Sequence, residues 1–361
     1  MMSDERFFLP GPTEVRPEVL DAMRHPMIPH RSAAMELLMQ TVHARLQPMF
    51  GTTRPVYVVT GPSTAAMEMA VRCGSIERVL ALVCGAFGER FAEIAELTGR
   101  EVTRVIAEPG QVVSPEQVRL ALENGNYDTV TVVHSETSTG ALSDVASIAK
   151  VVRDSSNAML LVDAVTSVGA MPIAMDAWGA DLVFAGSQKA LALPPGLAFV
   201  AASERLLNRG RTLFDCGYAL DLVRYDEFWH KSQSPMTPAI SLLFALDQQL
   251  SDIEFEGLPV RFARHAQMAR TCWDWVLMEG GGEHSLEILA GEGQRSPSVT
   301  CVMCDQPERV VRLLNERGFV IGAGHGELRR SSVRIGHMGD HTVAGLEMLL
   351  DVMAAVIRAL R

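Results

Sequence analysis

The sequence has few cysteines, few aromatic residues and no long apolar run. Its 361 residues include six cysteines, of which only Cys301 and Cys304 form a close pair. No second such pair completes a zinc site, and residues three apart on a strand face opposite sides, so we expect buried, reduced thiols and no bound metal. No stretch of about 18 apolar residues could span a bilayer, and the charged start MMSDERFFLPGPTE lacks the apolar core of a signal peptide. These absences predict a cytoplasmic protein without a membrane partner.

Positive charge is also scarce. The chain has 32 lysines and arginines against 43 aspartates and glutamates, a formal net charge of -11, and no basic run. A nucleic-acid binder needs a basic surface to neutralise phosphates, so we expect no nucleic-acid partner. The glycine-rich nucleotide motifs GxGxxG and GxxxxGK[ST] do not occur in the right setting. With 48% hydrophobic residues, 29 glycines and 18 prolines, the composition is that of a globular protein of roughly two domains.

Residues 55–200 alternate short β-branched runs with amphipathic segments. The expected strands are residues 56–59, 79–83, 102–106, 129–133, 159–162, 182–184 and 197–200. The expected helices begin at residues 63 and 86 and span residues 115–122 and 145–152. Alternating βα units predict an α/β fold with a mostly parallel sheet flanked by helices, and such sheets bind ligands beyond the carboxyl ends of their strands.

The pattern changes after residue 250. Helices are expected at residues 261–278, 307–317 and 343–360, around strands at 298–303 and 333–335. An amphipathic helix over residues 33–50 precedes the alternating region, because apolar residues recur there three or four apart. We therefore expect an N-terminal segment and large domain over residues 1–252, followed by a smaller α+β domain over residues 253–361.

Three loops at strand ends carry polar side chains of possible catalytic use. Ser63 and Thr64 open a helix directly after a strand, where backbone N–H groups and hydroxyls can bind phosphate or simply cap the helix. Asp163 ends an apolar strand, where a carboxylate needs a cation or hydrogen-bond donors. Lys189 lies among small residues, which suits an amine with a lowered pKa that forms a Schiff base. An Asp163–Lys189 ion pair that only joins two loops is the alternative from these residues alone.

Taken together, the motifs resemble those of the class V aminotransferases, the fold-type-I pyridoxal-phosphate family that includes the alanine–glyoxylate and serine–glyoxylate enzymes. The resemblance covers nearly the whole chain. It rests on LPGPT (9–13), HRS (30–32), TGPST (60–64), HSETSTG (134–140), VDAVTS (162–167), GSQK (186–189) with PPG (194–196), and RIGHMG (334–339).

The resemblance implies a role for each residue of the site. Lys189 holds the cofactor covalently and later moves a proton, while Asp163 pairs with the pyridinium nitrogen so that the ring acts as an electron sink. Arg334 clamps the substrate carboxylate with its bidentate fork. The remaining cofactor contacts that it implies are Phe87 and Val165 on the two ring faces, Thr137 at the phenolic oxygen, and Gly61, Ser63, Thr64 and Gln188 around the phosphate.

Some positions depart from the family pattern or stay open. Phe87 stands where the glyoxylate enzymes carry tryptophan. The resemblance also implies a homodimer, in which the segment of residues 232–238 supplies phosphate ligands across the interface. Ser234, Gln233 and Thr237 are the candidates for this role. His30 and Arg31 lie either near the substrate or at the interface, and His337 is interpreted as structural.

The resemblance thus implies a pyridoxal-phosphate aminotransferase that moves an amino group from a small amino acid to a 2-oxo acid such as glyoxylate or pyruvate. Alanine and serine lead as donors, ahead of aspartate and pyridoxamine. One alternative is a lyase of the cysteine desulfurase type, which needs a reactive cysteine on a mobile loop. The other is a catalytically inactive relative that acts as a binding subunit.

Overall fold

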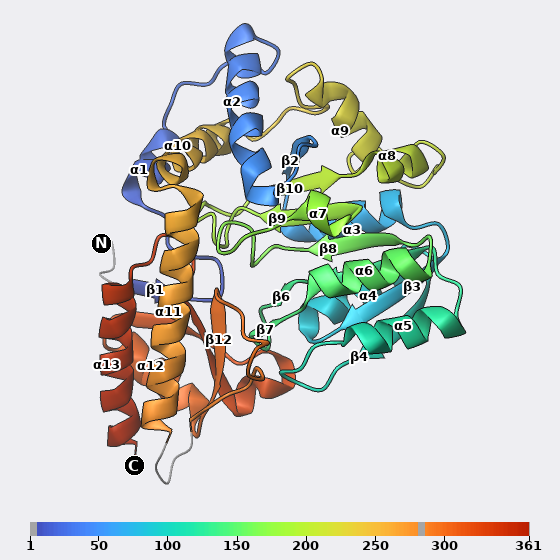
Figure 1. Cartoon of the computed structure of the whole chain (residues 1–361). Coiled ribbons are helices and arrows are strands. Elements are labelled where there is room, and N and C mark those ends of the chain that lie inside the picture. Colours follow the sequence, from blue (N-terminus) through green and yellow to red (C-terminus); the bar gives the residue numbers. More distant parts are fainter. Residues whose placement is uncertain (1–5, 281–285, 361) are drawn as a thin grey trace.

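Seven strands from the first part of the chain form one large sheet (Figure 1). The structure is a computed structural model, and it describes residues 6–280 and 286–360. The strand order is β2-β10-β9-β8-β5-β3-β4. Their bounds are β2 Val56–Thr60, β3 Arg78–Val83, β4 Glu101–Ile106, β5 Thr129–Val133, β8 Met159–Asp163, β9 Leu182–Gly186 and β10 Leu197–Ala202. Only β10 runs against its two neighbours. The predicted mostly parallel sheet is confirmed, and each predicted strand matches within two residues.

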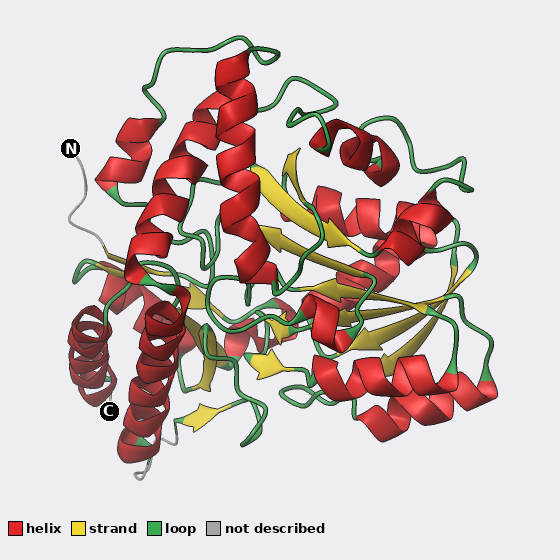
Figure 2. Ribbon diagram, turned by 45° about the horizontal axis from the view of Figure 1, so that its top comes forward, coloured by secondary structure: helices red, strands yellow, loops and turns green. Residues whose placement is uncertain are grey.

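Helices cover both faces of this sheet, which Figure 2 shows between layers of helices. On β8, Leu160 and Val162 face one apolar core while Met159 and Leu161 face the other, as alternating side chains must. The first core is closed by α2 (Ala33–Phe50), α5 (Pro115–Asn124), α6 (Val145–Ser155), α7 (Met175–Trp178) and α10 (Ile240–Glu256). The second is closed by α3 (Ser63–Gly74), α4 (Ala86–Leu97), α8 (Glu204–Gly210) and α9 (Leu222–Trp229). Because both faces are covered, the strands read as nearly continuous apolar runs.

A second sheet of five strands, in the order β1-β13-β14-β12-β11, forms with the C-terminal part of the chain. Its strands are β1 Arg6–Phe8, β11 Glu287–Ile288, β12 Val299–Met303, β13 Phe319–Ala323 and β14 Ser332–Gly336. Its helices are α11 Leu258–Glu279, α12 Pro307–Asn315 and α13 Val343–Ala359, with α11 and α13 side by side in Figure 1. The predicted helices and strands of this part match within three residues.

One strand of the second sheet comes from the other end of the chain. β1 pairs in parallel with β13, and Phe8 joins the apolar core under α11 and α13. The division at residues 252 and 253 stays a prediction. It falls inside α10, four residues before the link at Gly257, whose φ of 81° lies in the left-handed region that glycine tolerates.

A short hairpin connects the two sheets. β6 (Ser135–Glu136) and β7 (Ala141–Leu142) follow β5, and this hairpin hydrogen-bonds to the segment before β12, from Ser296 N to the Gly140 carbonyl at 2.8 Å. The carboxyl ends of β5 and β8 and the start of α3 and α4 therefore meet at the edge next to the second sheet. In the described ranges, no helix is long and apolar enough to cross a membrane.

Candidate active site

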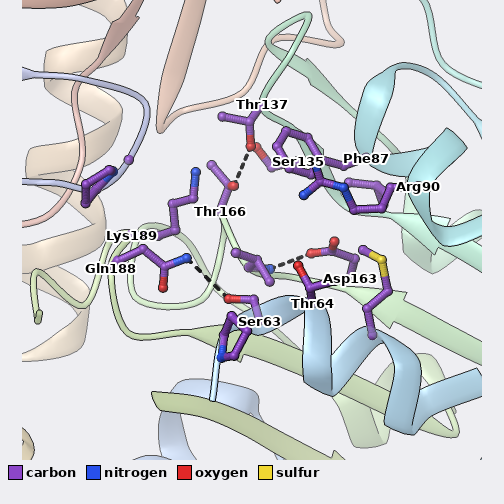
Figure 3. A pocket seen from close by; sticks show the side chains of 16 residues that line it. Ser63, Thr64, Phe87, Arg90, Ser135, Thr137, Asp163, Thr166, Gln188 and Lys189 are labelled. Carbon is purple, nitrogen blue, oxygen red and sulfur yellow. Dashed lines mark hydrogen bonds between the residues drawn. The ribbon is translucent and has the colours of Figure 1, made fainter. Parts of the chain in front are cut away.

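A cavity of about 180 Å³ lies at the carboxyl ends of β5, β8 and β9, where α3 and α4 begin. Figure 3 shows the side chains that line it, among them Asp163, Lys189 and Ser63. Eight of the predicted site residues line it, namely Ser63, Thr64, Phe87, Thr137, Asp163, Val165, Gln188 and Lys189. The fold therefore brings together, around one cavity, predicted site residues that lie up to 126 positions apart in the sequence.

Asp163 is a buried carboxylate at the end of the central strand β8. Its side chain lines the cavity, and its Oδ1 accepts a hydrogen bond from the Val165 backbone N–H at 2.8 Å. Burial raises the pKa of the Asp163 carboxyl to about 7, although that hydrogen bond and the charge of Lys189 act to lower it. A carboxylate in this position is stabilised most by a cationic N–H group placed in the cavity.

Lys189 lies in the turn between β9 and β10, and its amine points into the cavity. The Nζ atom donates a hydrogen bond to the Pro10 carbonyl. Burial lowers the pKa of the Lys189 amine to about 8, and the nearby charge of Arg334 lowers it further than Asp163 restores it. Such an amine is partly neutral near pH 8, as a nucleophile must be.

Gly11 leaves the room that Lys189 needs. A Cβ atom at Gly11 would come within 2.6 Å of Lys189 Nζ, and its φ of 113° is one that other residues rarely adopt. The loop of residues 9–13 thus approaches the lysine closely because glycine has no side chain.

The start of α3 forms the opposite end of the cavity. Pro62 is the N-cap residue and gives no side-chain cap. The Ala65 N–H donates to the Pro62 carbonyl at 2.8 Å, which leaves the N–H groups of Ser63 and Thr64 to face a ligand anion. Gln188 Nε2 donates to Ser63 Oγ at 3.4 Å, which gathers an amide and two hydroxyls, with Thr64, at this end. A Cβ at Gly186 would lie 2.0 Å from Ser63 Oγ, so glycine is required for this close approach.

Phe87, in the first turn of α4, and Thr137, in the turn after β6, flank the cavity. Thr137 Oγ1 and Thr166 Oγ1 are 2.7 Å apart and share a hydrogen bond (Figure 3). The buried carboxylate of Glu136 links the start of α4 to the turn after β6, because its Oε2 accepts from the Phe87 backbone N–H at 3.1 Å and its Oε1 accepts from the Ser138 backbone N–H at 3.0 Å. Glu136 also places a negative charge at the N-terminus of α4, where the helix dipole favours it.

Arg334 reaches the same wall from β14 of the second sheet. Its Nε donates to the Ala323 carbonyl at 2.9 Å and its Nη1 donates to the Thr137 carbonyl at 3.2 Å. Burial lowers the pKa of the Arg334 guanidinium, which stays charged at neutral pH. The predicted carboxylate clamp is thus adjacent to the cavity without lining it.

The other predicted site residues lie outside the cavity lining of a single chain. Gly61 precedes the lining residue Pro62 and donates to the Gly196 carbonyl at 2.9 Å. Thr237 is exposed between α9 and α10, and His30 precedes α2. Arg31 Nη1 donates to the Ser234 carbonyl at 2.7 Å, so it contacts the 232–238 segment. The roles predicted for Thr237, His30 and Arg31 stay predictions.

His337 and the cysteines have the structural environments expected from the sequence. His337 is buried and hydrogen-bonds through Nε2 to Thr300 Oγ1 at 2.8 Å. All six cysteines are buried and free of disulfides. Burial raises the pKa of the Cys301 thiol, and that of the Cys304 thiol to about 12, so neither is a ready nucleophile at neutral pH.

Sequence reasoning missed Arg90, Glu136, Thr166 and His325. Arg90 and Thr166 line the cavity, and the His325 ring lies 6.0 Å from the Phe87 ring. Local signals existed for two of them. Arg90 follows Phe87 by three residues, the spacing that places two side chains on one face of a helix, and Glu136 precedes the predicted Thr137. His325 carries no such signal, because it follows β13 of the second sheet and only the tertiary structure places its ring near Phe87.

These residues fit the chemistry of pyridoxal phosphate. The buried Asp163 carboxylate suits a protonated ring nitrogen, and the Lys189 amine has the lowered pKa that covalent binding of an aldehyde needs. The open N-terminus of α3 with its hydroxyls suits a phosphate. Among the residues that the structure describes, no group of His, Cys, Asp and Glu could hold a metal ion.

Comparisons with known proteins agree with this chemistry. The family model for aminotransferase class-V matches residues 7–338. An uncharacterized aminotransferase of Methanocaldococcus jannaschii is 36% identical, covering 98% of this chain and 92% of its own. The structure of an alanine–glyoxylate aminotransferase from Nostoc matches with a TM-score of 0.92 at 31% identity, over 100% of this chain and 96% of that chain.

An aspartate aminotransferase from Thermus thermophilus has a similar structure, with a TM-score of 0.90 at 32% identity over 99% of this chain and 100% of that chain. The family match covers most of the sequence, both structural relatives share the whole architecture, and the cavity carries the residues expected for the cofactor. The chain therefore belongs to the class V aminotransferases, enzymes that depend on pyridoxal phosphate.

Proposed function

We propose that this aminotransferase moves an amino group from a small amino acid, alanine or serine, to a 2-oxo acid such as glyoxylate or pyruvate, and that Lys189 binds the cofactor covalently. The observation that carries the proposal is the buried Lys189 amine, with its pKa lowered to about 8, in one cavity with Asp163. The alanine–glyoxylate activity named for the Nostoc relative supports the choice of donor and acceptor.

The cofactor supplies an electron sink for the substrate carbanion, and the chain supplies binding and proton transfer. Asp163 holds a proton on the ring nitrogen. Lys189 Nζ, which is about half neutral at pH 8, would take the proton from the Cα of the amino donor and, in the second half-reaction, give a proton to the Cα of the product that forms from the 2-oxo acid. The open α3 terminus with Ser63 and Gln188 binds the phosphate.

The other side chains of the cavity orient the reacting groups. Phe87 and Val165 both line the cavity and would pack against the cofactor ring. Thr137, held by its hydrogen bond to Thr166, donates or accepts at the phenolic oxygen. Arg334 would bind the substrate α-carboxylate and thereby orient the substrate Cα for proton transfer.

Replacing Arg334 tests the carboxylate clamp. Losing one member of a desolvated charge pair typically costs about 2–5 kcal/mol, so Arg334→Ala should lower kcat/KM for alanine with glyoxylate by roughly thirty-fold or more. Arg334→Lys keeps the charge and loses the two-pronged fork, so we expect weaker amino-acid binding with an unchanged absorption spectrum of the bound cofactor.

A donor without a carboxylate is the control for Arg334. A simple primary amine should react equally poorly with the wild type and with Arg334→Ala. If the variant damages the reaction of that amine as much as the reaction of alanine, Arg334 has a structural role, and Arg31 becomes the next candidate for the clamp.

We further propose a homodimer in which the 232–238 segment of one chain contributes to the site of its partner. Thr237 is exposed and lies outside its own chain's cavity lining, which supports a role toward a second copy. Sedimentation equilibrium should give twice the chain mass of 39.3 kDa; a monomer that remains fully active would contradict the dimer.

The two alternatives have less support. A desulfurase needs a reactive thiol beside the substrate, yet Cys301 and Cys304 are buried with raised pKa values. An inactive binding subunit has no need for Lys189 and Asp163 in one cavity. A panel of amino donors with glyoxylate and pyruvate, together with cysteine as substrate, separates the three functions.

A further inference from the structure

Arg261 is a buried arginine in the first turn of α11, where this helix follows α10 (Figure 1). Only 1% of its surface is exposed. Its Nε donates to the Gly169 carbonyl at 3.1 Å, and its Nη2 donates to the Ala190 carbonyl at 2.6 Å. Its Nη1 donates to Glu256 Oε2 at 2.8 Å and to Asp340 Oδ1 at 3.0 Å. Two nitrogens of this guanidinium therefore bind backbone carbonyls, and the third binds two carboxylates.

One of these carbonyls belongs to the turn that carries Lys189. Ala190 follows Lys189 directly in the sequence. The Lys189 carbonyl accepts from Thr13 Oγ1 at 3.0 Å and from the Ala192 N–H at 2.8 Å. Ala192 has a φ of 50°, in the left-handed region that residues with a Cβ atom rarely adopt. Such a conformation persists where the surrounding structure holds it, and the bond from Arg261 is one of the contacts that hold this turn.

The carboxylates connect Arg261 to the second sheet and to the end of α10. Asp340 lies four residues after β14 and also accepts from Arg16 Nε at 2.7 Å. Glu256 is the last residue of α10 and also accepts from Arg264 Nε at 2.8 Å. Burial acts to raise the pKa of Asp340, but the charges of Arg261 and Arg16 hold that pKa below its ordinary value. Asp340 is thus ionised, and each carboxylate keeps a partner when Arg261 is replaced.

We propose that Arg261 is a positioning residue for Lys189, because its guanidinium fastens the turn of Lys189 to the segment after β14 and so keeps the amine in the cavity. This inference rests on the role proposed for Lys189. Arg261 is not among the residues that line that cavity, so it acts through the backbone of the turn. Its loss leaves the protein folded, while the Lys189 amine is no longer held in one position.

The rate at which phosphate-free pyridoxal attaches to the cofactor-free enzyme reports the position of the amine without turnover. Absorbance follows the condensation, and borohydride reduction with peptide mapping identifies Lys189 as the site. In Arg261→Ala the rate constant should fall by about a hundred-fold, the loss that a misplacement of about 1 Å can cause. The rate constant, unlike the amplitude, does not depend on the fraction of folded protein, so a merely structural role would leave it unchanged.

The pH dependence of this rate tests whether the amine stays buried. Burial lowers the pKa of the Lys189 amine to about 8, so the wild-type rate should rise with a midpoint near pH 8 as the amine loses its proton. An amine that reaches water has its pKa raised toward the ordinary 10.5, so the midpoint in Arg261→Ala should lie higher. The charged groups that face the amine are unchanged in this variant, namely Asp163 of β8, Glu136 of β6, Arg334 of β14 and Arg90 of α4.

Arg261→Lys separates the hydrogen bonds from the charge. This variant keeps a positive charge beside Asp340 and Glu256, but a single ammonium group cannot reproduce the planar fork that binds the two carbonyls. We expect its rate constant to stay at least about ten-fold below that of the wild type, as the loss of a charge-assisted hydrogen bond implies. A wild-type rate and midpoint in Arg261→Lys would show that charge alone suffices, and the proposal would be wrong.

A second cavity offers a route for chemical rescue. It has a volume of about 330 Å³ and is lined by Arg261, Arg16 and Arg264 among others. Guanidinium ion added to Arg261→Ala, at concentrations too low to unfold the protein, should enter the vacated space and restore part of the rate. Urea has a similar shape without the charge and should restore less. Equal restoration by the two compounds would mean that filling the space is enough, which would overturn the assigned role.

Arg264→Ala is the matched control. Arg264 lies three residues further along α11 and pairs with the same Glu256, but it donates to the carbonyls of Gly339 and His341 and not to the turn of Lys189. Its replacement should leave the rate constant within about two-fold of the wild type. An equal loss in Arg264→Ala and Arg261→Ala would assign the effect to the whole ion-pair network and contradict a specific role for Arg261.

Hydrogen exchange separates this proposal from the proposed function. In the cofactor-free enzyme, the amides of Ala192 and Leu193, which hydrogen-bond within the turn, should exchange faster in Arg261→Ala than in the wild type. If pyridoxal attaches to no lysine of the wild type, the role proposed for Lys189 is wrong, and the exchange rates still decide whether Arg261 holds the turn. If pyridoxal attaches to Lys189 at the same rate in Arg261→Ala and the wild type, only the role of Arg261 is overturned.

Discussion

Replacing Lys189 with alanine is expected to lower transamination by at least about a thousand-fold, since one amine serves both for covalent binding and for proton transfer. Its lowered pKa of about 8 and its position against the Pro10 carbonyl prepare it for both roles. Steady-state kinetics with alanine and glyoxylate measure the loss. Small primary amines added to the variant should restore part of the activity, because they can enter the space that the side chain leaves and move the proton.

Lys150→Ala is the control for this change. Lys150 is an exposed residue of α6 that pairs with Asp154, and its replacement should leave kcat/KM within about two-fold, as for most surface substitutions. Near-normal turnover by Lys189→Ala, or a loss that no amine restores while the cofactor still binds covalently, would show that Lys189 lacks the assigned roles.

Asp163→Asn is expected to reduce kcat by about a hundred-fold or more while the protein stays folded. An amide cannot hold the ring nitrogen protonated, and losing one preorganised electrostatic partner typically costs factors of 10²–10³. Far-UV circular dichroism tests the fold, and turnover with alanine and glyoxylate tests the role. A variant that binds cofactor and turns over at the wild-type rate would disprove the role of Asp163.

The same substitution should stabilise the cofactor-free protein. Burial raises the pKa of Asp163 from 3.8 to about 7 in the folded protein. Ionisation of Asp163 therefore lowers the free energy of unfolding. This loss is complete above pH 7 and disappears below pH 3.8, the pKa of the carboxyl in the unfolded chain. The size of the shift corresponds to about 4 kcal/mol at most. Thermal melts should therefore show Asp163→Asn melting above the wild type at pH 8, with a gap that narrows toward pH 5.

Most of the fold could be predicted because its signals are local. Each buried strand of the large sheet is an apolar run that ends at a turn, and the long helices carry apolar residues three or four apart. Three strands of the second sheet, β1, β11 and β13, were not predicted, and β11 has only two residues. β13 ends in Gly322 and Ala323, which weakens its strand pattern, and the three residues of β1 become a strand only by pairing with β13, more than 300 residues away.

The candidate site likewise contains some residues that the sequence singles out and others that only the tertiary structure reveals. Asp163 and Lys189 stand out in the sequence. Asp163 ends an apolar strand and Lys189 lies among small residues, and a charged side chain in either place is unusual unless it has a functional or ion-pairing role. Arg90 and Glu136 do not stand out, because charged residues are common on amphipathic helices and in polar segments. Only the tertiary structure shows that both contact Phe87. The close approach of Gly11 to Lys189 is likewise set by packing between distant segments, which no local pattern records.

The most direct test of the covalent role of Lys189 is reduction of the cofactor-loaded enzyme with borohydride, followed by peptide mapping. The sequence contains only three lysines, Lys150, Lys189 and Lys231, so the map is unambiguous. Lys150 is exposed and paired with Asp154, and Lys231 contacts the Phe228 ring outside the cavity. We expect the reduced cofactor on Lys189 alone; finding it on Lys150 or Lys231, or on no lysine, would contradict the account.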